Sequence, residues 1–226
     1  MIYENIKEGI FIERVNRFIA NVSIDGKIET CHVKNTGRCK EILIEGSKVY
    51  VQEFDSETRK TKFDLISVYK GNKLINIDSQ VTNKMFNEWV KEGNLFNDLK
   101  LIKGEVFYKH SRFDFYVEYE NKKAFIEIKG VTLEENGVVL FPDAPTTRGV
   151  KHLKELISAK EEGYEGYIVF IVQMNGIKYF TPNVKMHKEF GDTLLKCKEN
   201  GINILAFDSI VESNSISIKN KVEVIV

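Results

Sequence analysis

The sequence predicts two domains, an N-terminal all-β barrel and a C-terminal α/β domain with a mixed sheet. Short strand-like runs separated by turn signals fill residues 9–78, and helix-length periodicity is missing there. Residues 83–99 then place apolar side chains at helical spacing. Beyond them, strand-like runs alternate with helix-length segments, which is the pattern of an α/β domain. A chain of 226 residues is long enough for two small domains of this kind.

The N-terminal prediction rests on a series of strand-like runs, with a hairpin turn at Asp25-Gly26. In order, the runs are GIFIERV, RFIANVSI, KIETCHV, SKVYVQEF, FDLISVYK and NKLINID. About five strands of this length close a small barrel, and the OB-fold is the commonest barrel of this size. We therefore expect an OB-fold-like domain over residues 1–82 and the α/β domain over residues 83–226.

The α/β domain is expected to begin with a helical connector at residues 83–100. Apolar residues recur there at helical spacing and Gly93 interrupts them, so we expect one or two short helices. Three strand-like runs follow, then VVLF, a helix from about Thr147 to the C-terminal glycine Gly163, and the run GYIVFIVQ. The order is therefore α-β-β-β-α-β, and a helix near residues 188–199, a strand and a hairpin complete the chain.

The run RFDFYVEYENKKAFIEIKG is predicted to form a hairpin that turns at Asn121-Lys122. In this register Asp114 lies opposite Lys129, and Tyr116 lies opposite Glu127. Because side chains alternate along a strand, a slip by one residue would move them to the opposite face, so the prediction requires an even-numbered loop. One face then carries Asp114, Tyr116, Phe125, Glu127 and Lys129, and the other carries Phe113, Phe115, Val117, Ile126 and Ile128.

The face with the charged residues predicts a metal-binding site. Asp114 is diagonal to Glu127 at about 7–8 Å between backbones, a span that two carboxylates can close around one ion. Hydrolysis of a phosphodiester near neutral pH needs a hard divalent cation and a positive charge near the developing negative charge. The carboxylates meet the first need through Mg²⁺, and Lys129 meets the second. A solvated sheet face with a cross-strand ion pair has the same spacing, so spacing does not separate the two interpretations.

The composition is that of a soluble globular protein, with 42% hydrophobic and 29% charged residues. The formal net charge is zero, so phosphate binding requires a local basic patch. No stretch approaches 18 apolar residues and no signal-peptide run occurs, so we expect a cytoplasmic protein that does not bind a membrane. Cys31, Cys39 and Cys197 lack CxxC spacing and the histidines lack metal-ligand spacing, so we expect reduced thiols and no zinc site.

Several long motifs occur together along the chain. They are Asn35-Thr36-Gly37 after His32, Ser111-Arg112-Phe113-Asp114-Phe115, Glu127-Ile128-Lys129-Gly130-Val131-Thr132-Leu133, Phe141-Pro142-Asp143-Ala144-Pro145-Thr146-Thr147-Arg148-Gly149 and Lys151-His152-Leu153-Lys154-Glu155-Leu156. With these motifs, essentially the whole chain resembles the sugar fermentation stimulation protein A (SfsA) family. The resemblance implies an N-terminal OB-like domain, a C-terminal domain of the PD-(D/E)xK nuclease type, and DNA as the partner.

The resemblance also implies roles for individual residues. Asp114 matches the first acid of the nuclease motif, and Glu127-x-Lys129 matches its second acid and its lysine. Glu105, one strand earlier, resembles an additional acid of many such nucleases, although an exposed strand acid is the alternative. These four residues form the expected catalytic set, in which Asp114 and Glu127 bind Mg²⁺ or Mn²⁺. The sequence departs from the motif at Phe113, which replaces the proline before the first acid.

Basic residues near the start of the helix at Thr147 are candidates for contact with DNA. Arg148 and Lys151 lie within one turn with His152, on a helix face that we expect to point away from Val150 and Leu153. A helix N-terminus favours anions, which suits a phosphate backbone. The alternative is that these residues are solvated surface.

Further candidates for DNA contact lie in the hairpin and in the first domain. Arg112 belongs to the hairpin, whereas Asn35 and Arg38 lie with Thr36 in a turn between two strands of the barrel. OB barrels bind single strands through basic grooves and stacking aromatic side chains. The alternative for the Asn35-Thr36-Gly37 segment is a tight turn without a binding role.

Three hypotheses about function follow from these features. The first is a magnesium-dependent nuclease that hydrolyses phosphodiester bonds in DNA. The second is a non-catalytic DNA-binding regulator of sugar metabolism genes that retains a nuclease fold. The third, a carbohydrate-binding OB domain, follows from the fold alone. The sequence leaves open whether the DNA is single-stranded, duplex or branched, whether cleavage is internal or terminal, and the oligomeric state.

Overall fold

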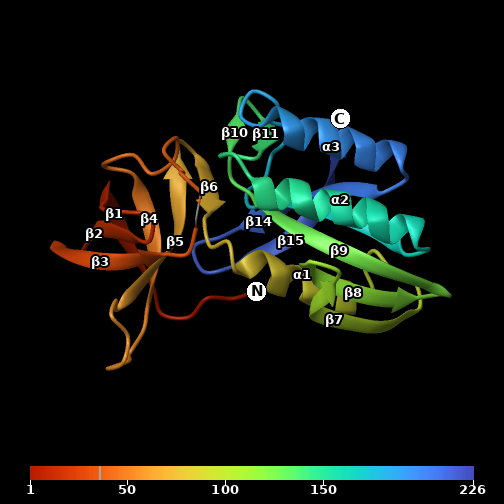
Figure 1. The fold of residues 1–226 in the computed structure, drawn as a ribbon. Helices are drawn as coiled ribbons and strands as arrows, with labels where there is room; N and C mark the ends of the chain where they lie inside the picture. The colour runs from red at the N-terminus through yellow and green to blue at the C-terminus, as the bar shows by residue number, and fades with distance from the viewer. Residues whose placement is uncertain (36) are drawn as a thin grey trace.

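A computed structural model describes residues 1–35 and 37–226, so Thr36 of the turn motif lies outside the described residues. Two parts lie side by side, a barrel of N-terminal strands and a mixed sheet covered by helices (Figure 1). This arrangement confirms the predicted succession of an all-β part and an α/β part. No helix within residues 1–35 and 37–226 is long and apolar enough to cross a membrane.

The N-terminal strands close into a barrel. They pair in the order β3-β2-β1-β4-β5-β6, and β3 also pairs in parallel with β5, which closes the barrel. Alternate side chains such as Val22, Cys31 and Val51 point into the barrel and are fully buried. The predicted OB-fold-like domain is confirmed, and β6 adds a hairpin to β5. The strands are β1 (Ile6–Arg14), β2 (Ile19–Ile24), β3 (Lys27–Val33), β4 (Lys48–Glu53), β5 (Phe63–Lys70) and β6 (Lys73–Asn76).

The C-terminal sheet has the strand order β10-β11-β13-β15-β14-β12-β9-β8-β7. It is mixed, as predicted, because β9, β12 and β14 are parallel whereas β7, β8 and β9 are antiparallel. The sequence patterns missed β10 and β13, which have only 2 and 4 residues. The strands are β7 (Leu99–Tyr108), β8 (Ser111–Tyr119), β9 (Lys122–Val131), β10 (Glu134–Glu135), β11 (Val138–Phe141), β12 (Glu165–Val172), β13 (Tyr179–Pro182), β14 (Asn203–Val211) and β15 (Ile216–Val224).

Helices cover both faces of this sheet (Figure 1). Helices α2 and α3 pack together on one face, and α1 packs on the other. The Thr146 hydroxyl caps α2 by accepting the Gly149 N–H at 3.0 Å, and Gly163 follows its end with a φ of 91°. These ends confirm the predicted extent of this helix, whereas the connector helix stops well before residue 100. The helices are α1 (Val81–Lys91), α2 (Thr147–Glu161) and α3 (Lys188–Glu199).

Strand β9 lies within the core and is buried on both faces. Phe125 packs on the α2 side with Phe113 and Leu153, whereas Ile126 belongs to the apolar cluster on the α1 side. A strand covered on both faces carries apolar residues almost without interruption. Glu127 interrupts this apolar run, and it is only 2% exposed. A carboxylate in such a position requires an explanation from its surroundings.

The two parts of the molecule meet through buried polar contacts. Gln173 follows β12 and is fully buried, and its amide donates to Asn76 Oδ1 at 2.8 Å and to the carbonyl oxygen of Asp78 at 2.9 Å. The N–H of Asn76 donates in turn to the carbonyl oxygen of Gln173 at 2.9 Å. Lys70 of the barrel also forms a 2.8 Å ion pair with Glu134 of β10. Because the connecting residues bond to both parts, the division at residue 82 stays a prediction.

Candidate functional site

The β8–β9 hairpin turns at Glu120-Asn121, one residue earlier than predicted. Tyr116 therefore lies opposite Phe125 and not opposite Glu127, which corrects the predicted register. The same register, extended beyond the paired residues, brings Asp114 opposite Glu127 instead of Lys129. Because the pairing shifts by two positions, an even number, the side chains that were expected to share a face still do so within the paired part of the hairpin.

Beyond this pairing, β8 separates from β9. The last pair joins Phe115 to Ile126. Past it, Phe113 turns to the α2 side, where its ring centroid is 5.2 Å from that of Phe125. Phe115 instead packs on Phe86 of α1, with ring centroids 5.6 Å apart. The prediction that Phe113 and Phe115 share a face is therefore wrong. The β8–β9 ladder ends between the two residues, although β8 stays paired with β7 at both.

The Asp114 carboxylate fills the place where the two strands separate. Its Oδ2 accepts the backbone N–H of Ile128 at 2.7 Å. Without this bond, that N–H would have no partner where β8 separates from β9. Its Oδ1 accepts an N–H from the side chain of Asn83 in α1, also at 2.7 Å. Two donors from different elements therefore hold the carboxylate in one orientation beside Glu127.

Glu127 is held from two sides through a single oxygen. Its Oε1 bonds to the Lys129 ammonium and to Nδ1 of His152. Its Oε2 is buried and has no hydrogen-bond partner within the described part of the chain. A buried carboxylate oxygen without a partner costs about 1–3 kcal/mol or more, so a site of this kind favours an added cation or donor.

The two carboxyl groups differ in proton affinity. Burial raises the pKa of Asp114, and the neighbouring charge of Glu127 raises it further, against smaller opposing effects of the Ile128 N–H and Lys129. Burial also acts to raise the pKa of Glu127, but Lys129 and His152 outweigh it and hold that pKa below its usual value. Two carboxylates that repel each other in a buried place form a favourable environment for a divalent cation.

His152 lies in a different place from the one expected. The predicted outward face is wrong for this residue, because His152 is only 3% exposed and contacts Glu127. Its Nε2 is 3.4 Å from Nε of Arg148, a group that can only donate, so Nδ1 carries the proton donated to Glu127. The spacing could have indicated this position, because residues three or four apart lie on the same face of a helix. His152 follows Gly149 by three positions and precedes Leu156 by four, and both are buried.

Arg148 and Lys151 lie on the surface of α2, as predicted, but they differ in their partners. Arg148 is exposed and its terminal amines have no hydrogen-bond partner within the described residues. Lys151 donates to the carbonyl oxygen of His110 and lies 3.9 Å from Glu155. Arg148 is therefore the more available of the two for an external anion.

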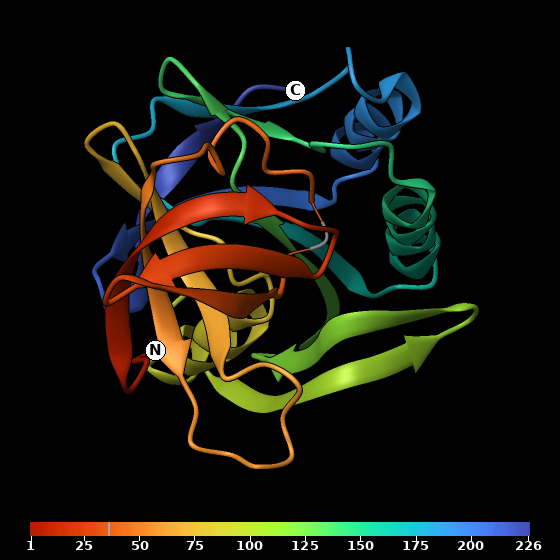
Figure 2. The ribbon, with the colours of Figure 1, turned by 90° about the vertical axis from the view of Figure 1, so that its left-hand side faces the viewer.

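Glu105 and Arg112 pair with each other at 2.7 Å on the β7–β8 hairpin, which extends from the body of the sheet (Figure 2). Glu105 has a φ of 59° and its side chain is 56% exposed. The structure brings Glu105 into an ion pair with Arg112 and not into contact with Asp114 or Glu127. Its assignment to the catalytic set stays a prediction.

The acidic residues do not form a complete metal cage by themselves. No group of three or more His, Cys, Asp or Glu side chains in the described ranges is arranged to hold a metal ion. Mg²⁺ often binds through only one or two carboxylates, with water and substrate phosphate oxygens as its other ligands. Asp114 and the free Oε2 of Glu127 fit this second kind of site.

The turn of the first domain is built around Asn35 and Gly37. Asn35 is buried, and its Oδ1 accepts the N–H of Gly37 at 2.7 Å. Arg38 is exposed, and its backbone N–H donates to the Asp143 carboxylate of the other domain at 2.9 Å. A Cβ at Gly37 would collide with this carboxylate and lie 2.8 Å from Asn35 Oδ1, so only glycine allows the close approach. Arg38 remains open to a ligand, whereas Asn35 shapes the turn.

The cysteines play no visible part in these sites. Cys31, Cys39 and Cys197 are free and buried. Burial raises the pKa of each thiol to about 12, which leaves very little thiolate at neutral pH. None of them is suited to act as a nucleophile.

Two protein-family models match the chain in succession. The SfsA N-terminal OB domain matches residues 12–77, and the sugar fermentation stimulation protein RE domain matches residues 80–215. A sugar fermentation stimulation protein homolog from Clostridium beijerinckii is 60% identical over 225 residues, covering 100% of both chains. A second homolog, from Ruminiclostridium cellulolyticum, is 58% identical over 224 residues and covers 99% of both chains.

A solved structure shows the same architecture. Pyrococcus furiosus SfsA in complex with Ca²⁺ is 30% identical to this chain and superposes with a TM-score of 0.92, covering 100% of this chain and 98% of that one. This likeness confirms the OB-fold-like barrel and the mixed sheet as one continuous fold. The family resemblance expected from the motifs is also confirmed, and the chain belongs to the sugar fermentation stimulation protein A family.

Proposed function

We propose that this protein is a metal-dependent nuclease that hydrolyses phosphodiester bonds in DNA. The observation that carries the proposal is the buried Oε2 of Glu127, which lacks a partner beside the fixed carboxylate of Asp114. Both acids belong to the acid-acid-lysine motif of PD-(D/E)xK nucleases, which supports Mg²⁺ or Mn²⁺ as the ion. Such an ion would polarise a phosphate oxygen and lower the pKa of water.

The side chains around the acids have distinct tasks in this proposal. Asn83 and the Ile128 N–H orient Asp114, and His152 holds Oε1 of Glu127 so that Oε2 stays free. We assign His152 a positioning role, in the way that outer hydrogen bonds orient metal-binding side chains. The functional carboxylate therefore depends on a residue of α2 that is remote in the sequence.

Lys129 supplies the positive charge of the proposed site. Its ammonium bonds to Glu127 Oε1 and is half-buried, with a side chain 16% exposed. The ammonium has three N–H donors, so it can bond to a phosphate oxygen without releasing Glu127. A positioned cation is worth most where negative charge develops during the reaction.

DNA is the proposed partner because cations on the surface of the protein lie near the buried acid site. Arg148 is joined to Glu127 through His152, so a phosphate bound by Arg148 would lie close to the acid site. Lys151 and Arg112 are candidates of lower availability, because each already has a protein partner. Arg38 on the barrel is part of a separate basic pocket.

The alternative function is a DNA-binding regulator that does not cut. The observation in its favour is that no third acidic or histidine ligand joins the two carboxylates within the described residues. In that case Lys129 would neutralise Glu127 as a structural ion pair. DNA binding without cleavage on every substrate would be the expected result.

The deciding experiment incubates the pure protein with single-stranded, duplex and branched DNA, in Mg²⁺, Mn²⁺ or a chelator. We expect cleavage only with metal, and a loss of about 10³-fold in rate for Asp114→Ala and for Lys129→Ala, because each removes charge stabilisation at the reacting phosphate. Asp192→Ala, an acid on the exposed face of α3, is the matched control and should cut normally. Unchanged cleavage in both site variants would refute this site.

A further inference from the structure

A second charged feature lies on the barrel, between the β1–β2 loop and the connection from β3 to β4. It is a cavity of about 340 Å³, within the range of small-ligand sites. Four of its lining residues are cations, and no carboxylate is among the described residues that line it. The lining consists of Arg14, Asn16, Arg17, Gly37, Arg38, Lys40 and Leu43, and we call this cavity the basic pocket. A concave site with charge of one sign concentrates ligands of the opposite sign.

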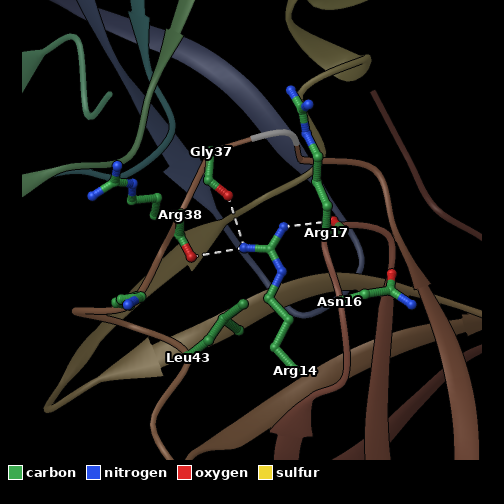
Figure 3. A pocket seen from close by; sticks show the side chains of 7 residues that line it. Arg14, Asn16, Arg17, Gly37, Arg38 and Leu43 are labelled. Carbon is green, nitrogen blue, oxygen red and sulfur yellow. Dashed lines mark hydrogen bonds between the residues drawn. The ribbon is translucent and has the colours of Figure 1, made fainter. Parts of the chain in front are cut away.

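Arg14 builds the pocket, and its terminal N–H donors are already bonded to protein carbonyl groups. Its Nη1 donates to the carbonyl oxygens of Gly37 and Arg38, and its Nη2 to those of Arg17 and Asn35, all at 2.7 Å. Figure 3 shows this guanidinium at the centre, with the side chains of Arg17 and Arg38 extending away from it. Arg14 therefore fastens two loops together and holds two other arginines at the mouth of the pocket.

The remaining cations are left for an external partner. Arg17, Arg38 and Lys40 are exposed, and no ion pair within 4.0 Å joins them to a carboxylate in the described ranges of the chain. Other barrel lysines are paired, for example Lys48 with Glu8 at 2.7 Å. Lys27 and Lys60 on the barrel also lack an ion pair among the described residues, but the basic pocket gathers three such cations in one concave site. A backbone phosphate fits this chemistry.

An apolar surface lies beside these cations. Phe18 is 51% exposed and Val15 is 53% exposed in the same loop, and the Arg17 guanidinium lies 5.7 Å from the centre of the Phe18 ring. Cations that track a backbone, together with an aromatic ring on which a base can stack, are the means by which OB barrels bind single strands. The base faces of a duplex are already stacked, so an exposed ring favours a single strand.

We propose that the basic pocket binds single-stranded DNA, with backbone phosphates on Arg17, Arg38 and Lys40 and a base against Phe18. The inference rests on the proposed function and deepens it, because it names the form of DNA that the acid site receives. Gly37 lines both the basic pocket and a second cavity of about 130 Å³ between the domains. Gly130, the residue after Lys129, lines that second cavity, so the two sites are neighbours.

The test measures binding of the full chain to fluorescent oligo-dT by anisotropy, in a chelator so that cleavage does not interfere. For the double variant Arg17→Gln/Lys40→Gln we expect affinity to fall by about 10-fold or more and the salt dependence to weaken by about 1.4 in slope, because two phosphate contacts are lost. The matched control Lys185→Gln/Lys219→Gln removes two exposed lysines elsewhere and should bind normally.

The stacking contact is tested separately. Phe18→Ala should weaken binding of the single strand by about 10-fold, because one base loses its aromatic partner. Ile28→Ala, which removes an apolar side chain that is 70% exposed, is the control and should have no effect. Normal affinity in both pocket variants, or a duplex bound as tightly as the single strand by the unaltered protein, would overturn the inference.

This test is independent of cleavage. Pocket variants that lose binding while the protein cuts no substrate would support the pocket and refute the nuclease. Metal-dependent cleavage with normal binding in the pocket variants would support the nuclease and refute the pocket.

Discussion

The acid site and the basic pocket hold their charges in opposite ways. In the acid site Glu127 is 2% exposed, and Lys129 and His152 bond to one of its oxygens. In the basic pocket Arg17 and Lys40 are exposed and unpaired within the described residues. A buried, bonded group has one geometry, as catalysis requires, whereas long exposed side chains adapt to a flexible partner. The contrast suits the proposed division of roles, in which the acid site would cut DNA and the basic pocket would hold it.

The largest expected effect is on the free energy of unfolding, which should depend on the acid site much more than on the basic pocket. Glu127→Ala should lower the free energy of unfolding by about 3–5 kcal/mol, because Lys129 and His152 lose their partner in a buried place. Arg17→Ala should change it by less than about 0.5 kcal/mol, since that side chain is exposed. Urea unfolding at pH 7, followed by circular dichroism, measures both. Similar losses in the two variants would contradict the contrast.

The next effect concerns the positioning role of His152. His152→Leu should weaken Mn²⁺ binding by about 10–100-fold, because Oε1 of Glu127 loses the donor that orients it. His152→Asn should retain most of the affinity, since its amide can donate from nearly the same place as Nδ1. Titration calorimetry with Mn²⁺ measures binding directly. A folded Leu variant with unchanged Mn²⁺ affinity would show that the contact is structural only.

The smallest effect concerns the ion pair between the domains. Burial acts to raise the pKa of Glu134, but the Lys70 ammonium and the Gly137 N–H outweigh it, and the folded-state pKa is lowered. A lowered carboxyl pKa stabilises the fold above the pKa of the unfolded chain, and this contribution is lost as pH falls through the folded-state value.

Glu134→Gln should therefore cost about 1 kcal/mol of unfolding free energy at pH 7 and less in acid. Urea unfolding measured from pH 7 down into acid tests this prediction. The exposed Glu199→Gln is the control, and its cost should not change with pH. A difference for Glu134→Gln that stayed constant with pH would exclude a role for its charge.

The sequence predicts the elements well because their signals are local. Alternation along 9–78 is enough for the barrel strands, and the span from Thr146 to Gly163 defines α2 through its cap and its terminal glycine. The hairpin register is harder, since Glu120 adopts a φ of 51° and starts the turn one residue early. A left-handed glutamate has no sequence signal, so the pairing moved although the faces were largely retained.

The candidate site was predictable only in part. Asp114, Glu127 and Lys129 come from two adjacent strands, so alternation brings them near one another. His152 reaches Glu127 from a helix 25 residues away, and that contact depends on how α2 packs on the sheet. The role of Arg14 likewise depends on carbonyl groups of two separate loops. Contacts between elements are set by tertiary packing, which periodicity does not encode.

The close approach at Gly37 has a consequence for the proposed cleavage of DNA. The domains touch there without room for a side chain, and the bonds between Gln173 and Asn76 tie them at a second point. The separation of the basic pocket from the acid site is therefore a constant of the fold. For a strand bound in the basic pocket and cut at the acid site, the fixed distance between the two would set the length of the fragment. Fragment length would then follow the protein's geometry and not the base sequence.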